Sequence, residues 1–387
     1  MVDGGSELNG RMRGHSKLRV PVAVFTALLS LVLATMTPLS RATAASTPLQ
    51  PLMVLRVPLS DTLYVVGNTG CVTSSCLHLV RTNDALGSYT TLSLPPVNPV
   101  RGVPSGSLGQ MVFANERDGY ALDEINGVTT LFVTHDGARS WHRQVVGNDL
   151  TISDLAASTS TVYVVAMRCV KKGKPNTGCT DYELFRADLA ATSWTSAPIP
   201  NGNAGPWGFM GRPAVFAKKL WLSQQTHSAL VVVSKDEGRS FESHPAPKLA
   251  SVVGCNLTAT SATTLWAECP TGMMASFFYS SNSGTSWRSL LGPRDPQFAG
   301  TGGGAFDPAS PDVAYIDFGQ IPRTNNVFRF SATRPDSRPV GTLTCLEVLS
   351  LVFTSDNSGL AICSDYRRTH FERTTDGGAH WRRYVLR

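Results

Sequence analysis

Four segments of the sequence repeat one short pattern, and this repeat limits the possible folds more than any other feature. The segments are Thr134–Trp141, Ser234–Phe241, Ser280–Trp287 and Thr374–Trp381. Their shared order is a hydroxyl residue, x, Asp, x, Gly, x, Ser and an aromatic residue, with similar residues at some positions. Three of them directly follow a short apolar run, so each segment is predicted to be the turn of a β-hairpin. The Asp carboxylate can accept hydrogen bonds from backbone N–H groups of its own turn, and Gly can adopt a positive φ there.

This pattern resembles the Asp box, also called the BNR repeat, of sialidase-like β-propellers. The residues at the Asp position are Asp136, Asp236, Asn282 and Asp376, and the closing aromatic residues are Trp141, Phe241, Trp287 and Trp381. Each aromatic residue is expected to bury apolar surface against a neighbouring unit. The resemblance implies that the boxes are structural and lie away from any active site. They therefore indicate the fold and leave the function open.

Weaker copies fill the intervals between the four boxes. One keeps Asp84, a second keeps Asp188, and a third near Ser331 keeps only the preceding strand. The seven copies begin at residues 82, 134, 186, 234, 280, 331 and 374, which are 43 to 52 residues apart. Four-stranded propeller blades repeat at a period of this kind. The sequence therefore predicts an all-β fold, a seven-bladed β-propeller, with six blades as the alternative because the sixth copy is the weakest.

The copies also predict where each blade begins and ends. The predicted ranges are 52–95, 105–147, 150–200, 205–248, 249–292, 300–340 and 341–387. In the second range, Phe113 is followed by Gly119–Leu122 and then by the box, an order that resembles blades of photosystem II stability/assembly-factor propellers. We expect each blade to own its four strands, so that no strand is exchanged where the ring closes. Trp381 is expected to help pack that closing junction.

The first 45 residues have the features of a targeting segment. Basic residues at positions 11, 13, 17 and 19 precede an apolar run from Val20 to Leu39, and Ala42-Thr-Ala44 offers a cleavage site. This order predicts a signal peptide at 1–45 and a single propeller domain at 46–387. The apolar run is long for a signal peptide, so an uncleaved signal anchor is the alternative. The expected location is extracytoplasmic, either secreted, periplasmic or at the cell surface.

Charge and composition exclude several classes of protein. The chain has 42% hydrophobic and 16% charged residues, which suits a globular core and not a disordered chain. Its formal net charge is +6, and because residues 1–45 hold five basic and two acidic residues, about +3 remains for the rest. That balance does not favour a nucleic-acid partner. We expect a monomer with no membrane span after residue 45 and no cofactor.

The eight cysteines fall as close pairs in alternate predicted blades. An even number of cysteines in a secreted chain indicates disulfides. The predicted bonds are Cys71–Cys76, Cys169–Cys179, Cys255–Cys269 and Cys345–Cys363. A metal site is not expected, because the sequence contains no C-x-x-C motif and a Cys71, Cys76 and His78 set would need a fourth ligand.

One tetrapeptide raises the possibility of glycoside hydrolysis. Leu55-Arg56-Val57-Pro58 resembles the F/Y-R-I-P motif of sialidases, whose Arg grips a substrate carboxylate. Such an enzyme also needs further arginines, a tyrosine nucleophile and an acid/base carboxyl group. Residues with suitable chemistry, none of them in a family motif, are Asp61, Arg212, Arg323, Tyr315 and Tyr366. The same tetrapeptide pattern occurs at Leu18–Pro21 inside the targeting segment, which weakens the motif.

Two basic segments are candidates for binding. The first is the C-terminal group with Arg367, Arg368, Arg382 and Arg383, and the second is the loop with Lys171, Lys172 and Lys174. Either could meet an anionic partner. The alternatives are a solvated strand face for the arginines and an ordinary polar hairpin tip for the lysines. The sequence favours a non-catalytic scaffold that binds a protein or glycan, with an exo-glycosidase of sialidase type as the second hypothesis.

Overall fold

The structure is a computed structural model, and it divides the chain into the units Met1–Ser46 and Thr47–Arg387. The described residues are 48–69, 77–82, 88–97, 108–125, 128–169, 179–200, 212–224, 230–247, 254–271, 274–290, 305–320, 324–333, 339–365 and 368–386. The predicted signal peptide or signal anchor at 1–45 lies outside them and remains a prediction. Among the described residues, no helix has the length and apolar character needed to cross a bilayer.

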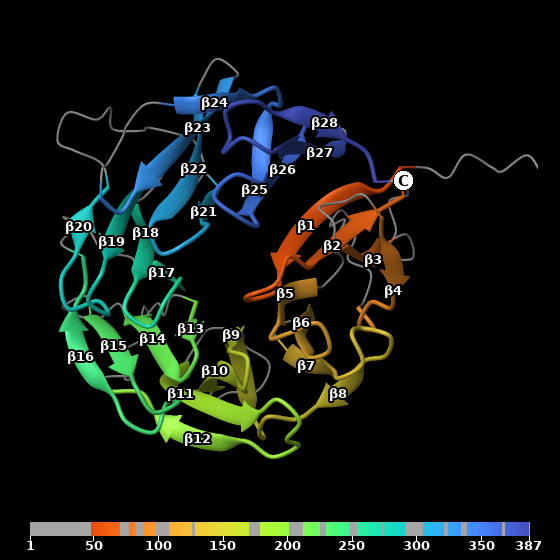
Figure 1. The fold of residues 1–387 in the computed structure, drawn as a ribbon. Coiled ribbons are helices and arrows are strands. Elements are labelled where there is room, and N and C mark those ends of the chain that lie inside the picture. The colour runs from red at the N-terminus through yellow and green to blue at the C-terminus, as the bar shows by residue number, and fades with distance from the viewer. Residues whose placement is uncertain are drawn as a thin grey trace, which may run out of the picture. The chain divides into compact units, whose positions relative to one another are not determined.

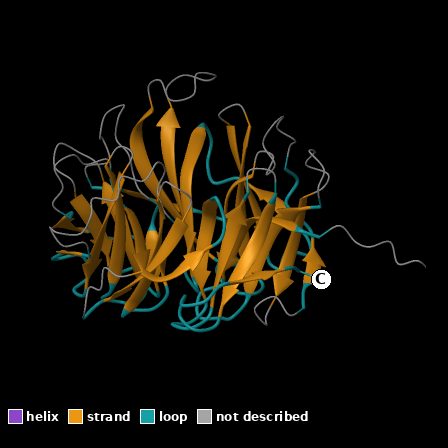
Figure 2. Cartoon of the chain, turned by 90° about the horizontal axis from the view of Figure 1, so that it is seen from above, coloured by secondary structure: helices purple, strands orange, loops and turns teal. Residues whose placement is uncertain are grey.

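Seven antiparallel sheets of four strands each make up the unit Thr47–Arg387. In every sheet the strands pair in sequence order, so each sheet is a simple meander. Figure 1 shows the sheets following one another around a central axis, with the first strand of each sheet innermost. Figure 2 shows the strands in orange, joined by loops in teal. The fold is therefore a seven-bladed β-propeller, as the repeat predicted, and the alternative of six blades is wrong.

The first four blades span residues 50–245. Their strands are β1 (Gln50–Arg56), β2 (Leu63–Asn68), β3 (Leu77–Thr82), β4 (Thr90–Leu92), β5 (Leu108–Phe113), β6 (Gly119–Ile125), β7 (Val128–Thr134), β8 (His142–Gln144), β9 (Leu150–Ala157), β10 (Thr161–Cys169), β11 (Cys179–Asp188), β12 (Thr195–Pro198), β13 (Ala214–Phe216), β14 (Lys219–Gln224), β15 (Leu230–Ser234) and β16 (Glu242–Pro245).

The last three blades span residues 256–384. Their strands are β17 (Asn256–Ala259), β18 (Leu265–Thr271), β19 (Met274–Ser280), β20 (Arg288–Ser289), β21 (Phe306–Pro308), β22 (Val313–Gln320), β23 (Thr324–Ser331), β24 (Pro339–Leu343), β25 (Glu347–Phe353), β26 (Gly359–Ser364), β27 (Thr369–Thr374) and β28 (Arg382–Tyr384). Blade six is a full blade, although its box copy is the weakest. The predicted boundary between residues 340 and 341 is wrong, because β24 of blade six crosses it.

The apolar core lies between blades and not within any one of them. Seven clusters of buried side chains each combine residues of two adjacent blades. Side chains of a strand point alternately to the two faces of its sheet, so each blade covers one neighbour with each face. This explains the near-continuous apolar runs in inner strands such as β2, in which five of six residues are buried.

The ring closes without exchange of a strand, as predicted. Strand β1 pairs with β2 of its own sheet, and β28 pairs with β27 of the last sheet. The junction of blades seven and one is held by packing in which Val54 and Leu63 meet Ile362, Phe371 and Leu386. The propeller therefore depends on side-chain burial, and not on a shared sheet, to keep its first and last blades together.

Trp381 does not pack this junction, which corrects the expectation from the sequence. It lies edge-on to Phe353, with 6.0 Å between ring centroids, in the cluster between blades six and seven. Trp141, Phe241 and Trp287 likewise belong to clusters shared with the preceding blade. The closing aromatic residue of each turn therefore faces backward along the chain, so the last one cannot reach blade one.

The four predicted turns share one hydrogen-bond pattern. In the first, the Asp136 Oδ1 accepts the Ser140 N–H at 3.0 Å and the Thr134 hydroxyl at 2.9 Å, while the Thr134 oxygen accepts the Ala138 N–H. The equivalent bonds occur around Asp236, Asn282 and Asp376. The Ser140 hydroxyl also donates to Asp136 Oδ2 at 2.6 Å. This bond is the main cause that lowers the pKa of Asp136, because it favours the ionised carboxylate.

Two successive residues in each turn have positive φ. The pairs are Gly137 and Ala138, Glu237 and Gly238, Ser283 and Gly284, and Gly377 and Gly378, with φ between 60° and 88°. The sequence predicted a positive φ only for the second residue of each pair. The N–H of the first member donates to the first hairpin loop of its own blade, for example Gly137 to the Arg117 carbonyl at 2.9 Å. The turn therefore ties the third and fourth strands to the first two.

The order Phe113 and Gly119 in blade two recurs as Phe353 and Gly359 in blade seven. Phe113 stacks on Tyr64 of blade one at 3.6 Å, and Phe353 stacks on Tyr315 of blade six at 3.5 Å. Each Phe ring lies over the glycine paired with it, where a Cβ would come within 2.5 Å or 2.7 Å of ring carbons. Glycine is therefore required beside each Phe.

Two matched glycine variants test how closely the turns are packed. Gly238 and Gly284 have φ of 84° and 85°, so alanine costs about 1–2 kcal/mol of backbone strain at either. A Cβ at Gly238 would lie 2.6 Å from the buried Leu184 Cδ2, whereas at Gly284 its nearest atom is 3.4 Å away. We expect Gly238→Ala to lower the free energy of unfolding by about 1–3 kcal/mol more than Gly284→Ala in urea titrations. Equal losses would contradict this account of the packing.

Candidate functional site

Arg56, the candidate carboxylate clamp, lies at the ring closure. Its Nη1 donates to the Phe353 carbonyl of blade seven at 2.9 Å and to the Ala309 carbonyl of blade six at 3.3 Å. Asp307 of β21 accepts the Phe353 N–H at 2.5 Å, and burial raises the Asp307 pKa to about 6 against the opposing effects of that bond and of Arg56. The guanidinium thus joins three blades through backbone carbonyls.

The other residues of the hypothetical glycosidase set do not gather around Arg56. Asp61 is exposed in the hairpin between β1 and β2. Arg212 precedes β13 in blade four and acts electrostatically on Asp154 of β9. Tyr315 of β22 is buried, and its hydroxyl donates to the Asp356 carbonyl at 2.6 Å. Arg323 and Tyr366 lie outside the described residues. Arg56 and Asp61 thus belong to blade one, Arg212 to blade four and Tyr315 to blade six, and no hydrogen bond or ion pair joins any two of these described residues.

Asp154 belongs to a polar contact between blades two and three that the sequence did not reveal. The Gln110 side chain of β5 donates to Asp154 Oδ1 at 2.6 Å and accepts the Leu155 N–H at 2.9 Å. Burial raises the pKa of Asp154, and the Gln110 bond opposes that shift. The two hydrogen bonds of the Gln110 amide fix the position of β5 in blade two relative to β9 in blade three. Gln110 and Asp154 therefore have a structural role.

Two of the four predicted disulfides are present, Cys255–Cys269 and Cys345–Cys363, with Cα–Cα distances of 4.2 Å and 5.4 Å. Cys169 and Cys179 are Cα partners in the register of β10 and β11, but their side chains are outside the described set. Cys71 and Cys76 lie outside the described residues altogether. Those two bonds remain predictions.

The candidate binding residues are only partly described. Arg382 and Arg383 are exposed on β28, the outer edge of blade seven, and Arg368 is exposed near the opposite end of β27. Arg367 and the lysines at 171, 172 and 174 lie outside the described residues. Charged side chains on a short edge strand also prevent pairing with another sheet. The exposed arginines can therefore serve binding, protection of the edge, or both.

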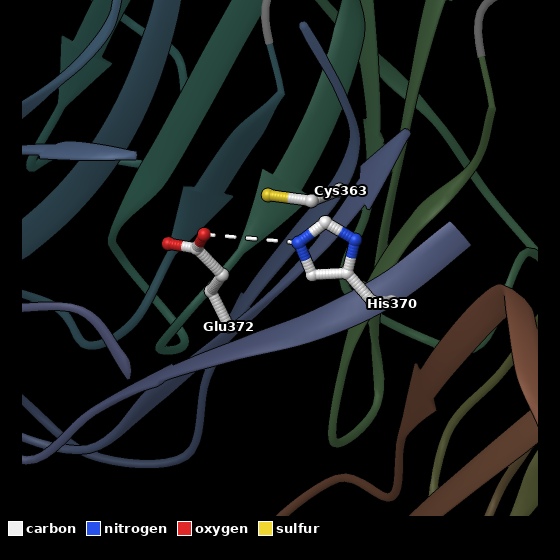
Figure 3. A group of neighbouring side chains, drawn as sticks. All are labelled: Cys363, His370 and Glu372. Atoms are coloured by element: carbon white, nitrogen blue, oxygen red, sulfur yellow. Dashed lines mark ion pairs between the residues drawn. The ribbon is translucent and has the colours of Figure 1, made fainter. Parts of the chain in front are cut away.

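A group of potential metal ligands lies in blade seven, where the sequence did not predict one. Cys363 of β26 and His370 and Glu372 of β27 place ligand atoms within 4.8 Å of one another, and all three side chains are buried. Figure 3 shows the Cys363 sulfur above the line between the Glu372 carboxylate and the His370 ring. A signal exists in the sequence, since alternate residues of one strand share a face and Cys363 pairs with His370 across a short hairpin.

Two further polar side chains lie buried in blade six. Asn325 of β23 donates to the Cys345 carbonyl at 2.5 Å, which links blade six to the disulfide. Asp317 of β22 is 2% exposed, and its Oδ1 has no hydrogen-bond partner. Burial alone raises the pKa of Asp317 to about 7. Asp317 is therefore a buried carboxyl group, and no neighbouring positive charge among the described residues lowers its pKa.

Comparison with known proteins identifies the fold alone. No family model matches the chain, and no curated protein matches it either. A structure of prolyl endopeptidases shares 12% identity and a TM-score of 0.61, covering 88% of this chain and 50% of that chain. The β-propeller domain of the Trilobed protease from Pyrococcus furiosus shares 8% identity and a TM-score of 0.55, covering 88% and 96%.

A structure of YCF48 bound to a D1 peptide is also similar, with 14% identity and a TM-score of 0.48, covering 72% of this chain and 80% of that chain. The chain thus spans only half the length of the prolyl endopeptidase but nearly all of the isolated propeller domain. What this chain shares with the peptidase structures is the β-propeller fold.

The buried Asp317 predicts a pH-dependent loss of stability. Its folded-state pKa of about 7 exceeds the ordinary value of 3.8, so the wild type is destabilised as the pH rises from about 4 to 7. We expect Asp317→Asn to raise the free energy of unfolding by about 2–4 kcal/mol at pH 8 and to change it little below pH 4. Chemical denaturation across this range measures the difference. The exposed Asp312→Asn is the control, and a pH-independent difference for Asp317→Asn would refute the explanation.

Proposed function

We propose that the chain acts outside the cytoplasm as a non-catalytic propeller that binds a protein or glycan partner. We also propose that it is an Asp-box propeller. The repeated bonds around Asp136, Asp236, Asn282 and Asp376 support this, because each carboxylate or amide is occupied within its own turn. Such residues stabilise blades and are not available to a ligand.

The observation that carries the non-catalytic proposal is the use of Arg56. A carboxylate clamp needs a guanidinium whose donors point into an open site. Arg56 Nη1 instead serves the carbonyls of Phe353 and Ala309 and lies beside the acidic Asp307. A nearby carboxyl group would oppose binding of a substrate carboxylate. The residue is therefore better suited to joining blades than to recognising a sialoside.

The extracytoplasmic part of the proposal rests on the N-terminal sequence and on the disulfides. Basic residues, an apolar run and a small-x-small site occur in the order expected of a signal peptide. The buried bonds Cys255–Cys269 and Cys345–Cys363 suit an oxidising compartment. For the partner, the exposed Arg382 and Arg383 favour an anionic surface.

Substitution of Arg56 separates a structural role from a catalytic one. We expect Arg56→Ala to lower the free energy of unfolding by about 1–3 kcal/mol, because two carbonyls lose a charged donor. We expect neither the wild type nor this variant to hydrolyse a fluorogenic sialoside. The exposed Arg143→Ala on β8 is the control and is expected to change stability by less than about 0.5 kcal/mol. Wild-type turnover above the blank that disappears in Arg56→Ala would establish the glycosidase instead.

Substitution of the edge arginines tests where a partner binds. The mature chain is presented to a glycan array that includes acidic glycans and to extracytoplasmic proteins in a cross-linking pull-down. We expect Arg382→Ser/Arg383→Ser to weaken binding of an anionic partner about 5-fold or more. His142→Ser/Arg143→Ser removes exposed residues from the equivalent edge of blade two and is the matched control. Equal binding by the two variants would show that the arginines of β28 are only a solvated strand face.

A further inference from the structure

We propose that the Cys345–Cys363 disulfide masks a metal site, and that its reduced form binds a zinc-type divalent cation through Cys345, Cys363, His370 and Glu372. Cys345 precedes β25, Cys363 is in β26, and the other two residues are in β27. The proposal concerns a site separate from the partner surface and does not depend on it.

The four side chains already share one buried position. Exposure is 2% for Cys345, 0% for Cys363, 7% for His370 and 2% for Glu372. The Cys363 sulfur, a His370 ring nitrogen and a Glu372 oxygen lie within 4.8 Å of one another, and the disulfide brings the Cys345 sulfur to the same place. Two cysteines, one histidine and one carboxylate are a donor set that tetrahedral zinc accepts.

Polar atoms at this position are not fully satisfied in the disulfide form. Glu372 Oε1 accepts the Thr344 hydroxyl at 2.5 Å, but Glu372 Oε2 and His370 Nδ1 have no hydrogen-bond partner. The closest approach of His370 Nε2 to Glu372 Oε1 is 3.8 Å, which is too long for a hydrogen bond. Unpaired buried polar atoms are costly, and a cation bound by the Glu372 carboxylate would offset the cost of burying it.

The surroundings of His370 also fit a metal ligand. Its Nδ1 lies 3.5 Å from Asp365 Oδ2, on the side of the ring away from Glu372. This distance is an ion-pair contact and not a hydrogen bond in the disulfide form. A carboxylate that accepts a hydrogen bond from one ring nitrogen leaves the other nitrogen free to bind a metal, and Asp365 is close enough to take that part when the metal is bound. Asp365 is therefore suited to be a positioning residue, and His370 Nε2 would face the cation.

The redox step requires a dithiol reductant. The dithiol transfers two electrons and two protons to the Cys345–Cys363 bond and becomes a disulfide itself, which leaves two protein thiols. On binding the cation, each thiol releases its proton to solvent and the sulfur becomes a thiolate ligand. Oxidation of the thiols by a disulfide reverses the sequence and releases the cation.

Blade five provides an internal control. Its buried Cys255–Cys269 bond has a similar place in the blade, with Cys269 on the second strand. The residues equivalent to His370 and Glu372 are Ser276, which pairs with Cys269, and Phe278, which pairs with Ala267. The two disulfides thus share their scaffold. Among the described residues, only the disulfide in blade seven has a histidine and a carboxylate within reach of one of its sulfurs as a ligand group.

The test compares zinc binding by the oxidised and the reduced full chain. The chain is reduced with a phosphine under anaerobic conditions, and Zn²⁺ is titrated against a chromophoric chelator. We expect reduction to create a zinc site in the wild type. The Cys345→Ser/Cys363→Ser variant is expected to lack this site, and the Cys255→Ser/Cys269→Ser variant is expected to keep it. We expect His370→Asn and Glu372→Gln, each of which removes a direct ligand, to weaken it by more than about 10-fold, the lower end of the loss seen for outer-shell partners. With Co²⁺ as the probe, thiolate-to-metal charge-transfer absorption should appear in the wild type and be lost in the Cys345→Ser/Cys363→Ser variant.

Tryptophan fluorescence and circular dichroism with and without Zn²⁺ cover the case in which reduction unfolds the chain. A metal site in the native fold would restore the native spectra, and it would protect Cys345 and Cys363 from alkylation. The proposal is overturned if the reduced chain gains no site or stays unfolded with Zn²⁺. It is equally overturned if binding survives Cys345→Ser/Cys363→Ser, or if His370→Asn and Glu372→Gln bind as the wild type does.

Discussion

Every blade of this propeller depends on the packing of two sheets face to face. A four-stranded sheet with apolar side chains on both faces cannot remain in water, so each blade needs a neighbour on both sides. The seven buried clusters meet this need, because each is shared by two adjacent blades. Stacked pairs such as Tyr64 with Phe113 and Tyr315 with Phe353 give two of these interfaces a defined geometry. A ring is the arrangement that leaves no blade with an uncovered face.

The closure of the ring differs from the other interfaces, because the chain does not continue from blade seven into blade one. With no exchanged strand, blades seven and one are joined by side chains alone, and β1 contacts β25, β26 and β27. Arg56 adds a polar connection, since its guanidinium reaches carbonyls in both blade six and blade seven. A long, permanently charged side chain can span blades that no shared backbone ladder connects. The residue that most suggested catalysis in the sequence is thus explained by the closure of the fold.

The sequence predicted the elements that local chemistry determines and missed those that depend on distant partners. Asp136 and Ser140 lie in one turn, so their bonds and the blade period followed from spacing alone. Arg56 could not be assigned, because its acceptors Phe353 and Ala309 are 297 and 253 residues away. The direction of Trp381 was missed for a similar reason, since only the ring geometry decides which neighbouring blade an aromatic residue meets. Of the predicted disulfides, the two that the structure describes followed from short loops between neighbouring strands.

The distribution of buried polar groups distinguishes the last two blades from the others. Among the described residues, six buried side chains carry an acid, amide or imidazole group, and Asp317, Asn325, His370 and Glu372 of blades six and seven are four of them. Packing alone would favour an apolar residue at such a position, as Phe278 shows, since it is the buried counterpart of Glu372 in blade five. Buried polar groups lower stability unless they are fully paired, so stability alone does not explain these four residues. The blade is repeated seven times, so each interface between blades has a similar scaffold. The apolar interfaces stabilise the ring, and this allows the interface of blades six and seven to hold buried polar groups.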